Sequence, residues 1–183
     1  MIETAATALT MTALRDRENA VLRVAPSLPD DRPAVRRLIL TSGIFGAADA
    51  DCVDDMFLQS LRQPSDDNYR FLSCWEESPQ RSPRMIGFAC CGREALTKGA
   101  WDLFWICVDC AARGKGAGGM LLTEAQRLAI EDGARLMVIY TSSTDIYAPA
   151  RRLYESQQFT RVAVVPDYYA DGDDLFIYSK RLK

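Results

Sequence analysis

The chain has 183 residues and a net charge of −3, and a length of this order suits one folded domain with a sizeable core. Apolar residues make up 48% and charged residues 26%, as in globular proteins, and no apolar run reaches the ~18 residues of a membrane span. The weakly acidic balance does not support nucleic-acid binding. We therefore expect neither nucleic acid nor a membrane as a partner.

The first 20 residues are rich in Ala and Thr, and no basic region precedes an apolar run in them. They do not have the pattern of a secretory signal. We expect this lead-in (1–20) to be either disordered or helical, and we expect a cytoplasmic protein. Residues 21–183 are expected to form a single domain.

Hydrophobic periodicity after residue 20 predicts a mixed α/β order of elements. In chain order we expect a strand at 21–25, helices at 29–40 and 49–61, strands at 70–75, 85–91 and 100–108, a helix at 116–132, a strand at 135–141, a helix at 149–157, and strands at 159–165 and 174–182. The polar segment 76–84 is expected to be the long tip of a hairpin. Exposed edge strands near the C-terminus are compatible with a homodimer.

Two of the six cysteines, Cys107 and Cys110, have the C-x-x-C spacing of redox and zinc sites. The sequence contains no histidine and no second C-x-x-C pair, so we expect no metal site. Four of the six cysteines lie in apolar runs, which indicates buried thiols in a reducing compartment. Residues three apart in an extended chain point to opposite faces, so the two thiols are expected to point apart.

A glycine-rich segment follows the most apolar strand and leads into an amphipathic helix. Four glycines occupy six positions, from Gly114 to Gly119, and they permit a turn whose amides point inward. The N-terminus of the helix adds unpaired N–H groups and the positive end of its dipole. Arg113 and Lys115 supply cations at the rim. The segment therefore predicts a cradle for a pyrophosphate.

Three other interpretations of this glycine-rich segment are alternatives to a pyrophosphate cradle. A Walker A motif needs Ser or Thr after the lysine, whereas Gly116 follows Lys115. A Rossmann fingerprint fits the spacing of Gly114, Gly116 and Gly119, but it belongs to the first βα turn of a sheet and not to a loop after a hairpin. A turn without a ligand is the remaining alternative, and four glycines with two cations at a helix start argue against it.

Two motifs resemble the GNAT superfamily of acetyltransferases. The segment from Arg113 to Gly118 fits the signature Gln/Arg-x-x-Gly-x-Gly/Ala, and 150–155 followed by Phe159 resembles the family segment Asn-x-x-Ala-x-x-Leu-Tyr-x-x-x-Gly-Phe. Tyr147 stands where Asn is common and Gln158 where Gly is common. The resemblance implies a mixed, mostly antiparallel sheet of about six or seven strands flanked by about four helices. It also implies acetyl-CoA as cosubstrate, held by Arg113, Gly114, Lys115, Gly116, Ala117 and Gly118.

Asp102 is the only charged residue in the apolar strand 100–108. Burying a carboxylate in such a strand costs free energy unless the carboxylate is paired or has a functional role. Desolvation would raise its pKa toward that of a useful base. The GNAT resemblance places it eleven residues before Arg113, where several members carry a glutamate general base. The alternative is an exposed carboxylate at the mouth of the strand, and the sequence leaves both open.

The resemblance makes Tyr154 the acid that protonates the departing thiolate, a role open to a phenol. A core tyrosine beside Leu153 is the alternative. By the same resemblance, the backbone amides of Ile106 and Val108 contact the oxyanion and the pantetheine. Two further tyrosines, Tyr168 and Tyr169, are expected to form a wall for the substrate together with Tyr147.

The sequence thus predicts an N-acetyltransferase that moves an acetyl group from acetyl-CoA to a primary amine by direct transfer in a ternary complex. The acceptor is expected to be a small molecule or an amino-acid-like amine. Two alternatives remain at this stage: acetylation of a protein N-terminus or lysine, and a non-catalytic acyl-CoA-binding module.

Overall fold

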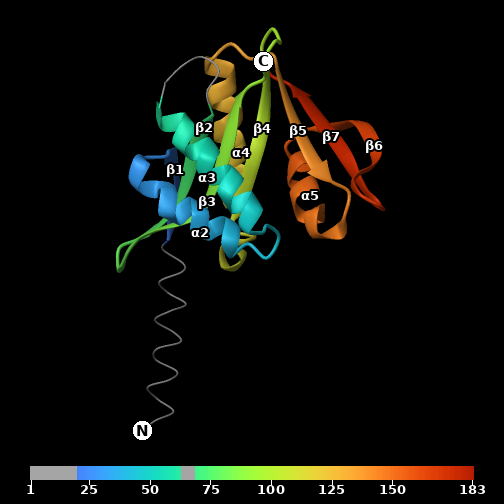
Figure 1. Cartoon of the computed structure of the whole chain (residues 1–183). Helices are drawn as coiled ribbons and strands as arrows, with labels where there is room; N and C mark the ends of the chain where they lie inside the picture. Colours follow the sequence, from blue (N-terminus) through green and yellow to red (C-terminus); the bar gives the residue numbers. More distant parts are fainter. Residues whose placement is uncertain (1–19, 63–68) are drawn as a thin grey trace.

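Seven strands form one mixed sheet in the order β1-β2-β3-β4-β5-β7-β6, and four α-helices pack on it (Figure 1). The computed structural model describes residues 20–62 and 69–183, so all but the last residue of the expected lead-in lies outside the described part. The mixed α/β class and the expected numbers of strands and helices are confirmed for these residues. None of the described helices is long and apolar enough to cross a membrane.

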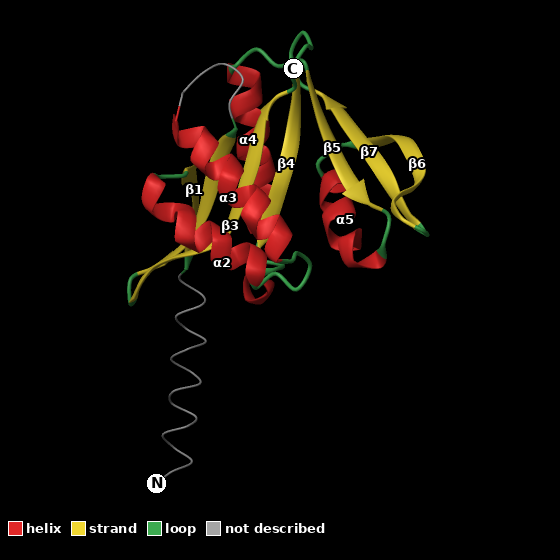
Figure 2. Cartoon of the chain, viewed as in Figure 1, coloured by secondary structure: helices red, strands yellow, loops and turns green. Residues whose placement is uncertain are grey.

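Figure 2 distinguishes the helices from the strands. The strands are β1 (Val21–Pro26), β2 (Arg70–Ser78), β3 (Arg81–Arg93), β4 (Ala100–Val108), β5 (Leu136–Ser142), β6 (Thr160–Ala170) and β7 (Asp173–Arg181). The α-helices are α2 (Arg32–Leu40), α3 (Ala47–Arg62), α4 (Ala117–Glu131) and α5 (Ala148–Ser156), and the 3-10 turns are η1 (Pro29–Asp31), η2 (Cys110–Ala112) and η3 (Asp145–Tyr147).

Each face of the sheet has its own apolar core. Helices α2 and α3 cover one face, where Ile39 and Phe57 pack with Phe88 of β3. Helix α4 covers the opposite face, and its buried residues recur at helical spacing, as Leu121 and Ala125 do. Figure 1 shows α2 and α3 in front of the strands and α4 behind them. The core on the α4 face extends past β4 to Met137 of β5 and Tyr178 of β7.

The ladder between β4 and β5 is short. It is parallel, it starts at Ala100, and it ends at the pair Leu103–Ile139. Phe104 is an extra residue on β4, since Cys91 and Cys90 of β3 pair with Leu103 and Trp105. Such a β-bulge bends its strand. Beyond it β4 pairs only with β3 and β5 only with β7, so the two parts of the sheet diverge from the end at which the chain terminates (Figure 1).

The hairpin of β2 and β3 has a tighter tip than expected. Both strands continue through the polar segment 76–84, and Pro79 and Gln80 alone connect them. The prediction of a long polar tip is therefore wrong. A backbone ladder does not require apolar side chains, and outer pairs such as Ser78–Arg81 lie beyond the core, where β3 is exposed.

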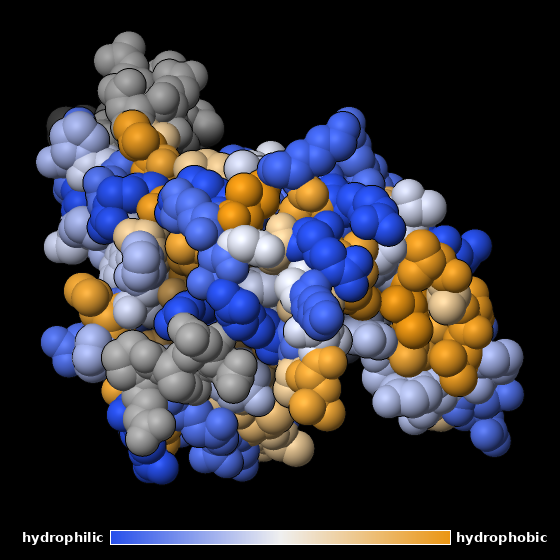
Figure 3. Space-filling view, turned by 90° about the horizontal axis from the view of Figure 1, so that it is seen from above, coloured by the Kyte–Doolittle hydropathy of each residue, from blue (hydrophilic) through white to orange (hydrophobic). Residues whose placement is uncertain are grey.

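Strand β6 is also longer than predicted, because it continues past Val165 to Ala170. Its register with β7 shifts between these two residues, and Asp167 adopts a positive φ of 53°. The connection between the strands expected at 159–165 and 174–182 is thus reduced to a turn at 171–172. All 11 residues of β6 are exposed, and Figure 3 shows an apolar area on the side of the molecule where β6 lies.

Candidate active site

A cavity of about 690 Å³ lies where β4 and β5 diverge. Its walls come from the separated parts of the two strands, the loop and first turn of α4, helix α5, and the connection between α2 and α3. A concave site of this size suits a small ligand or a cofactor segment.

The backbone of β4 directs unpaired groups into this cavity. Asp109 donates its N–H to the carbonyl of Ile86 in β3 at 2.8 Å, and successive residues of a strand direct their main-chain groups to opposite edges. The main-chain groups of Val108 and Ile106 therefore point away from β3, toward the side on which β5 no longer pairs. Both residues line the cavity.

The loop before α4 turns on two glycines with left-handed backbones, Gly114 at φ 78° and Gly116 at φ 90°. Gly116 is the N-cap of α4 and has no side chain to cap the helix. The first N–H groups of the helix, at Ala117 and Gly118, therefore remain available at the cavity wall. Open amides at a helix N-terminus attract anions.

Gly118 serves a second purpose, which the sequence did not reveal. A Cβ at this position would lie 3.1 Å from Cδ2 of Leu153 in α5, whereas a Cβ at the neighbouring Gly119 would be 3.9 Å from the nearest atom, Nε2 of Gln157. The absence of a side chain at Gly118 thus lets α5 pack closely against the start of α4.

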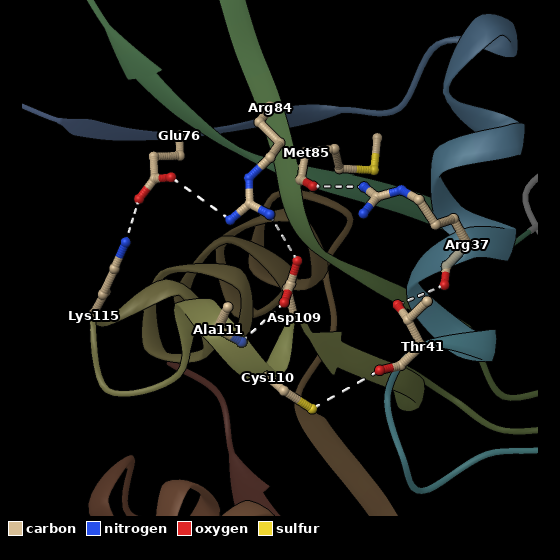
Figure 4. Close-up of polar contacts among 9 residues, drawn as sticks. All are labelled: Arg37, Thr41, Glu76, Arg84, Met85, Asp109, Cys110, Ala111 and Lys115. Atoms are coloured by element: carbon tan, nitrogen blue, oxygen red, sulfur yellow. Dashed lines mark hydrogen bonds and ion pairs between the residues drawn. The ribbon is translucent and has the colours of Figure 1, made fainter. Parts of the chain in front are cut away.

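Both cations of the loop have protein partners. Lys115 donates to Oε1 of Glu76 at 2.5 Å, and Arg113 donates to the Ser42 carbonyl at 3.1 Å. Figure 4 shows Arg84 reaching from β3 to both Glu76 and Asp109, at 3.8 and 3.0 Å. The loop is thereby tied to the β2–β3 hairpin and to the segment after α2, so its cations are anchored groups and not free ones.

Cys107 and Cys110 both contact the C-terminal end of α2. Cys107 donates its thiol to the Leu38 carbonyl at 3.5 Å, and Cys110 to the Ser42 carbonyl at 3.0 Å. The expectation that they point apart is wrong, because the strand ends at Val108 and the chain turns in η2. Burial raises the pKa of Cys107 to about 12, so this thiol stays protonated and serves packing.

Tyr154 is 4% exposed and lines the cavity. Its ring packs against Tyr178 with centroids 5.8 Å apart, and no described residue forms a hydrogen bond with its hydroxyl. Burial first, and then the neighbouring Tyr147 and Tyr178, raise the pKa of this phenol well above its usual value. Tyr154 is therefore a neutral hydrogen-bond donor at any physiological pH.

Asp102 is only 5% exposed, which excludes the alternative of a solvated carboxylate at the strand mouth. Burial, followed by the hydrogen bond and charge of Glu94, raises its pKa to about 7. Asp102 is not among the residues that line the cavity. It does raise the pKa of Tyr140, a cavity residue whose pKa is also raised by burial, so the two side chains are near one another.

Of the three expected substrate-wall tyrosines, Tyr147 and Tyr169 line the cavity and Tyr168 does not. Tyr168 packs edge-on against Tyr169 with ring centroids 5.0 Å apart. The sequence interpretation missed Phe45 and Asp49, which come from the connection after α2 and the first turn of α3. No motif marks these residues, since only the packing of α2 and α3 on the sheet brings them to the cavity.

A family model described as an acetyltransferase (GNAT) domain matches residues 67–161, more than half of the chain. The chain belongs to the GNAT family of acetyltransferases. A protein from Desulfovibrio desulfuricans assigned to this family has a similar structure, with a TM-score of 0.81 and 31% identity over 89% of this GNAT chain and 100% of that one. A search of curated proteins gave no match.

Two other solved structures share the GNAT fold at lower identity. The ribosomal-protein-S18-alanine N-acetyltransferase from Escherichia coli has a TM-score of 0.69 and 19% identity, covering 89% of this chain and 95% of its own. The protein yncA from Salmonella typhimurium, solved with its cofactor acetyl-CoA, has a TM-score of 0.66 and 20% identity, covering 88% and 94%.

In this GNAT chain, Gly118→Val should lower the free energy of unfolding by about 1–3 kcal/mol, because the added atoms overpack the contact with Leu153. Gly119→Val is the matched control in the same helical turn, and it should change stability by less than about 1 kcal/mol, because its Cβ meets only an ordinary contact. Urea denaturation measures both. Equal losses would show that the α4–α5 contact does not set the requirement for glycine.

Proposed function

We propose that this GNAT chain binds acetyl-CoA in the cavity between β4 and β5 and transfers the acetyl group directly to a primary amine of a small molecule in a ternary complex. The observation that carries the proposal is that open helix amides, diverging β4 amides and the side chain of Tyr154 line one cavity. The acetyl-CoA in the yncA structure, which shares the fold, supports the same assignment.

The chain's residues fit the two polar parts of this cosubstrate. The loop from Arg113 to Gly118 offers the pyrophosphate its N–H groups, and a Cβ built at Gly114 or Gly116 would meet no atom within 4 Å, so the space before the loop is open. The main-chain groups of Ile106 and Val108 offer the pantetheine arm the pairing that β5 does not supply.

The proposed reaction is a direct transfer of the acetyl group from sulfur to nitrogen. The amine nitrogen attacks the thioester carbonyl carbon, a C–N bond forms, and the C–S bond breaks as the thiolate leaves with its electron pair. Main-chain N–H groups of β4 stabilise the oxyanion of the tetrahedral intermediate. One proton must leave the amine and one must reach the thiolate sulfur, which requires a base and an acid.

Tyr154 is the proposed acid. Its raised pKa means that it carries its proton at every working pH and cannot serve as the base. Its hydroxyl donates to the departing sulfur, which gains electron density as the C–S bond breaks. Since a thiolate is a fairly stable leaving group, the contribution should lie at the lower end of general acid catalysis.

Asp102 is the proposed base. A carboxyl whose pKa is about 7 is half ionised near neutral pH and can accept a proton there. Because Asp102 does not line the cavity, it would act through solvent beside Tyr140, and not by direct contact with the amine.

Gly116→Val should raise the dissociation constant for acetyl-CoA at least tenfold, because a β-branched residue disfavours the left-handed backbone that aims the loop amides. Gly133→Val is the control, since Gly133 has φ 78° at the other end of α4 and an equally open Cβ position. Calorimetric titration with acetyl-CoA measures both. Unchanged affinity in the Gly116 variant would refute the pyrophosphate assignment.

Tyr154→Phe should lower kcat about 100-fold at every pH while acetyl-CoA affinity stays nearly constant, because only proton donation is lost. Tyr178→Phe is the control: its ring neighbours Tyr154, but its hydroxyl bonds Glu155 at 2.8 Å and does not face the cavity. Thiol release with one good acceptor follows both variants. A Tyr154 variant with normal kcat would remove this residue from the mechanism.

Asp102→Asn tests the base role of Asp102 through the pH dependence of kcat/KM, compared between wild type and variant. The ratio of wild-type to variant kcat/KM should fall as pH drops through about 7, because Asp102 becomes protonated there and the amine's own titration cancels. A pH-independent ratio of one would exclude a base role for Asp102.

The same substitution has an expected effect on stability. Because the pKa of Asp102 is raised to about 7, the folded chain retains a proton that the unfolded chain loses near pH 4. The free energy of unfolding of the wild type therefore decreases as the pH rises from about 4 to about 7. Asp102→Asn removes this penalty and should stabilise the fold at pH 8 by up to about 4 kcal/mol, with little effect at pH 4. Urea denaturation at the two pH values checks the sign.

A further inference from the structure

The charged side chains that line the cavity come from different segments of the chain. Arg113 is the only basic residue among the described residues that line it, and it belongs to the phosphate loop. Two acids, Asp49 and Asp173, are the only carboxylates of the lining, and they come from α3 and from the start of β7. The carboxylates of the described lining therefore lie outside the phosphate loop.

Neither acid is neutralised by a described cation. Asp49 accepts the Gly46 N–H at 2.8 Å with one oxygen, and Asp173 accepts the Ser142 hydroxyl at 2.6 Å. No ion pair joins Asp49 or Asp173 to a described Lys or Arg. After burial, both charges raise the pKa of Tyr147, which shows that they act on the same part of the cavity.

Aromatic rings line the same cavity as these acids. Phe45 lies edge-on to Trp105 with centroids 5.3 Å apart, and to Tyr147 at 6.2 Å. These rings come from three separate segments, namely the connection after α2, strand β4 and turn η3. With Tyr169 from β6 they form an apolar wall that can hold a ring or a cation.

We propose that the acceptor is a primary amine carried on an aromatic or apolar body with no carboxylate beside the amine. The two acids attract the ammonium form and repel a carboxylate, and the one basic side chain of the described lining, Arg113, belongs to the loop proposed to hold the pyrophosphate. The ring wall binds the body of the acceptor. This inference rests on the proposed transferase activity and narrows its acceptor, setting free α-amino acids apart from simple arylalkylamines.

An unpartnered hydroxyl at the same cavity supports a ligand here. Tyr154 as a whole is buried, with an exposed fraction of 4%, and its hydroxyl has no hydrogen-bond partner among the described residues. Trp101 Nε1 is the only fully buried side-chain nitrogen or oxygen without a partner among those residues, so the Tyr154 hydroxyl remains accessible from the cavity that it lines and can donate to a group bound there. The acids and rings thus adjoin a site built for reaction.

Three probes separate the features of the acceptor. Tyramine and tyrosine differ by a carboxylate, and tyramine and ethanolamine differ by the ring. With acetyl-CoA as donor, kcat/KM for tyramine should exceed that for tyrosine and that for ethanolamine at least tenfold each. Acetyl-CoA binding is measured separately by calorimetry, so that a failure of the proposed function is recognised as a loss of that binding.

Asp49→Asn tests the charge itself, because the amide oxygen can still accept the Gly46 N–H. It should raise the KM for tyramine about tenfold, reduce the preference for tyramine over tyrosine, and leave the acetyl-CoA dissociation constant unchanged. Asp171→Asn is the control, since Asp171 is exposed in the β6–β7 turn and does not line the cavity.

Three results would overturn the inference while leaving acetyl-CoA binding intact. The first is tyrosine, ethanolamine or a peptide N-terminus acetylated as well as tyramine or better. The second is no acetylation of tyramine. The third is an Asp49→Asn variant whose KM and amine preference match the wild type. If acetyl-CoA itself does not bind, the proposed function falls, and this inference falls with it.

Discussion

The arrangement of the site depends on the point at which β4 and β5 stop pairing. Their parallel ladder ends at Leu103 and Ile139, and the bulge at Phe104 follows at once on β4. Beyond it, the main-chain groups of Ile106 and Val108 have no neighbouring strand, and such groups need another partner. A sheet that paired to its end would satisfy them internally and would leave no cavity.

Helix placement follows from the same divergence. α4 packs against the strands on the β4 side of the divergence, its N-terminus lies at the cavity, and α5 comes close to it at Gly118 and Leu153. The glycines of the loop have two different structural roles. Gly114 and Gly116 provide left-handed backbone turns, while Gly118 provides room for a neighbouring helix. A glycine-rich sequence pattern does not show which glycine has which role, and only the packing in the structure distinguishes the two roles.

The sequence was informative where the chemistry is local in the chain. The glycine turn and the helix start after it could be predicted because their residues are contiguous, and the burial of Asp102 could be expected from its apolar strand. The extent of the β2–β3 ladder could not, because backbone pairing continues through polar residues such as Glu76. Phe45 and Asp49 could not be assigned either, since they reach the cavity only through the packing of α2 and α3 on the sheet.

The charged side chains around the loop and in the cavity differ in how they are paired. Lys115 is paired with Glu76, and Arg84 adds a cation between Glu76 and Asp109, so the charges around the loop are largely balanced within the protein. A bound pyrophosphate would consequently depend on N–H dipoles fixed by the fold more than on mobile cations that must first be ordered. The carboxylates of Asp49 and Asp173, which line the same cavity, lack cationic partners among the described residues. Within the described part of the chain, Lys115 beside the loop is thus paired with a carboxylate, whereas the two carboxylates of the cavity are not paired with a cation.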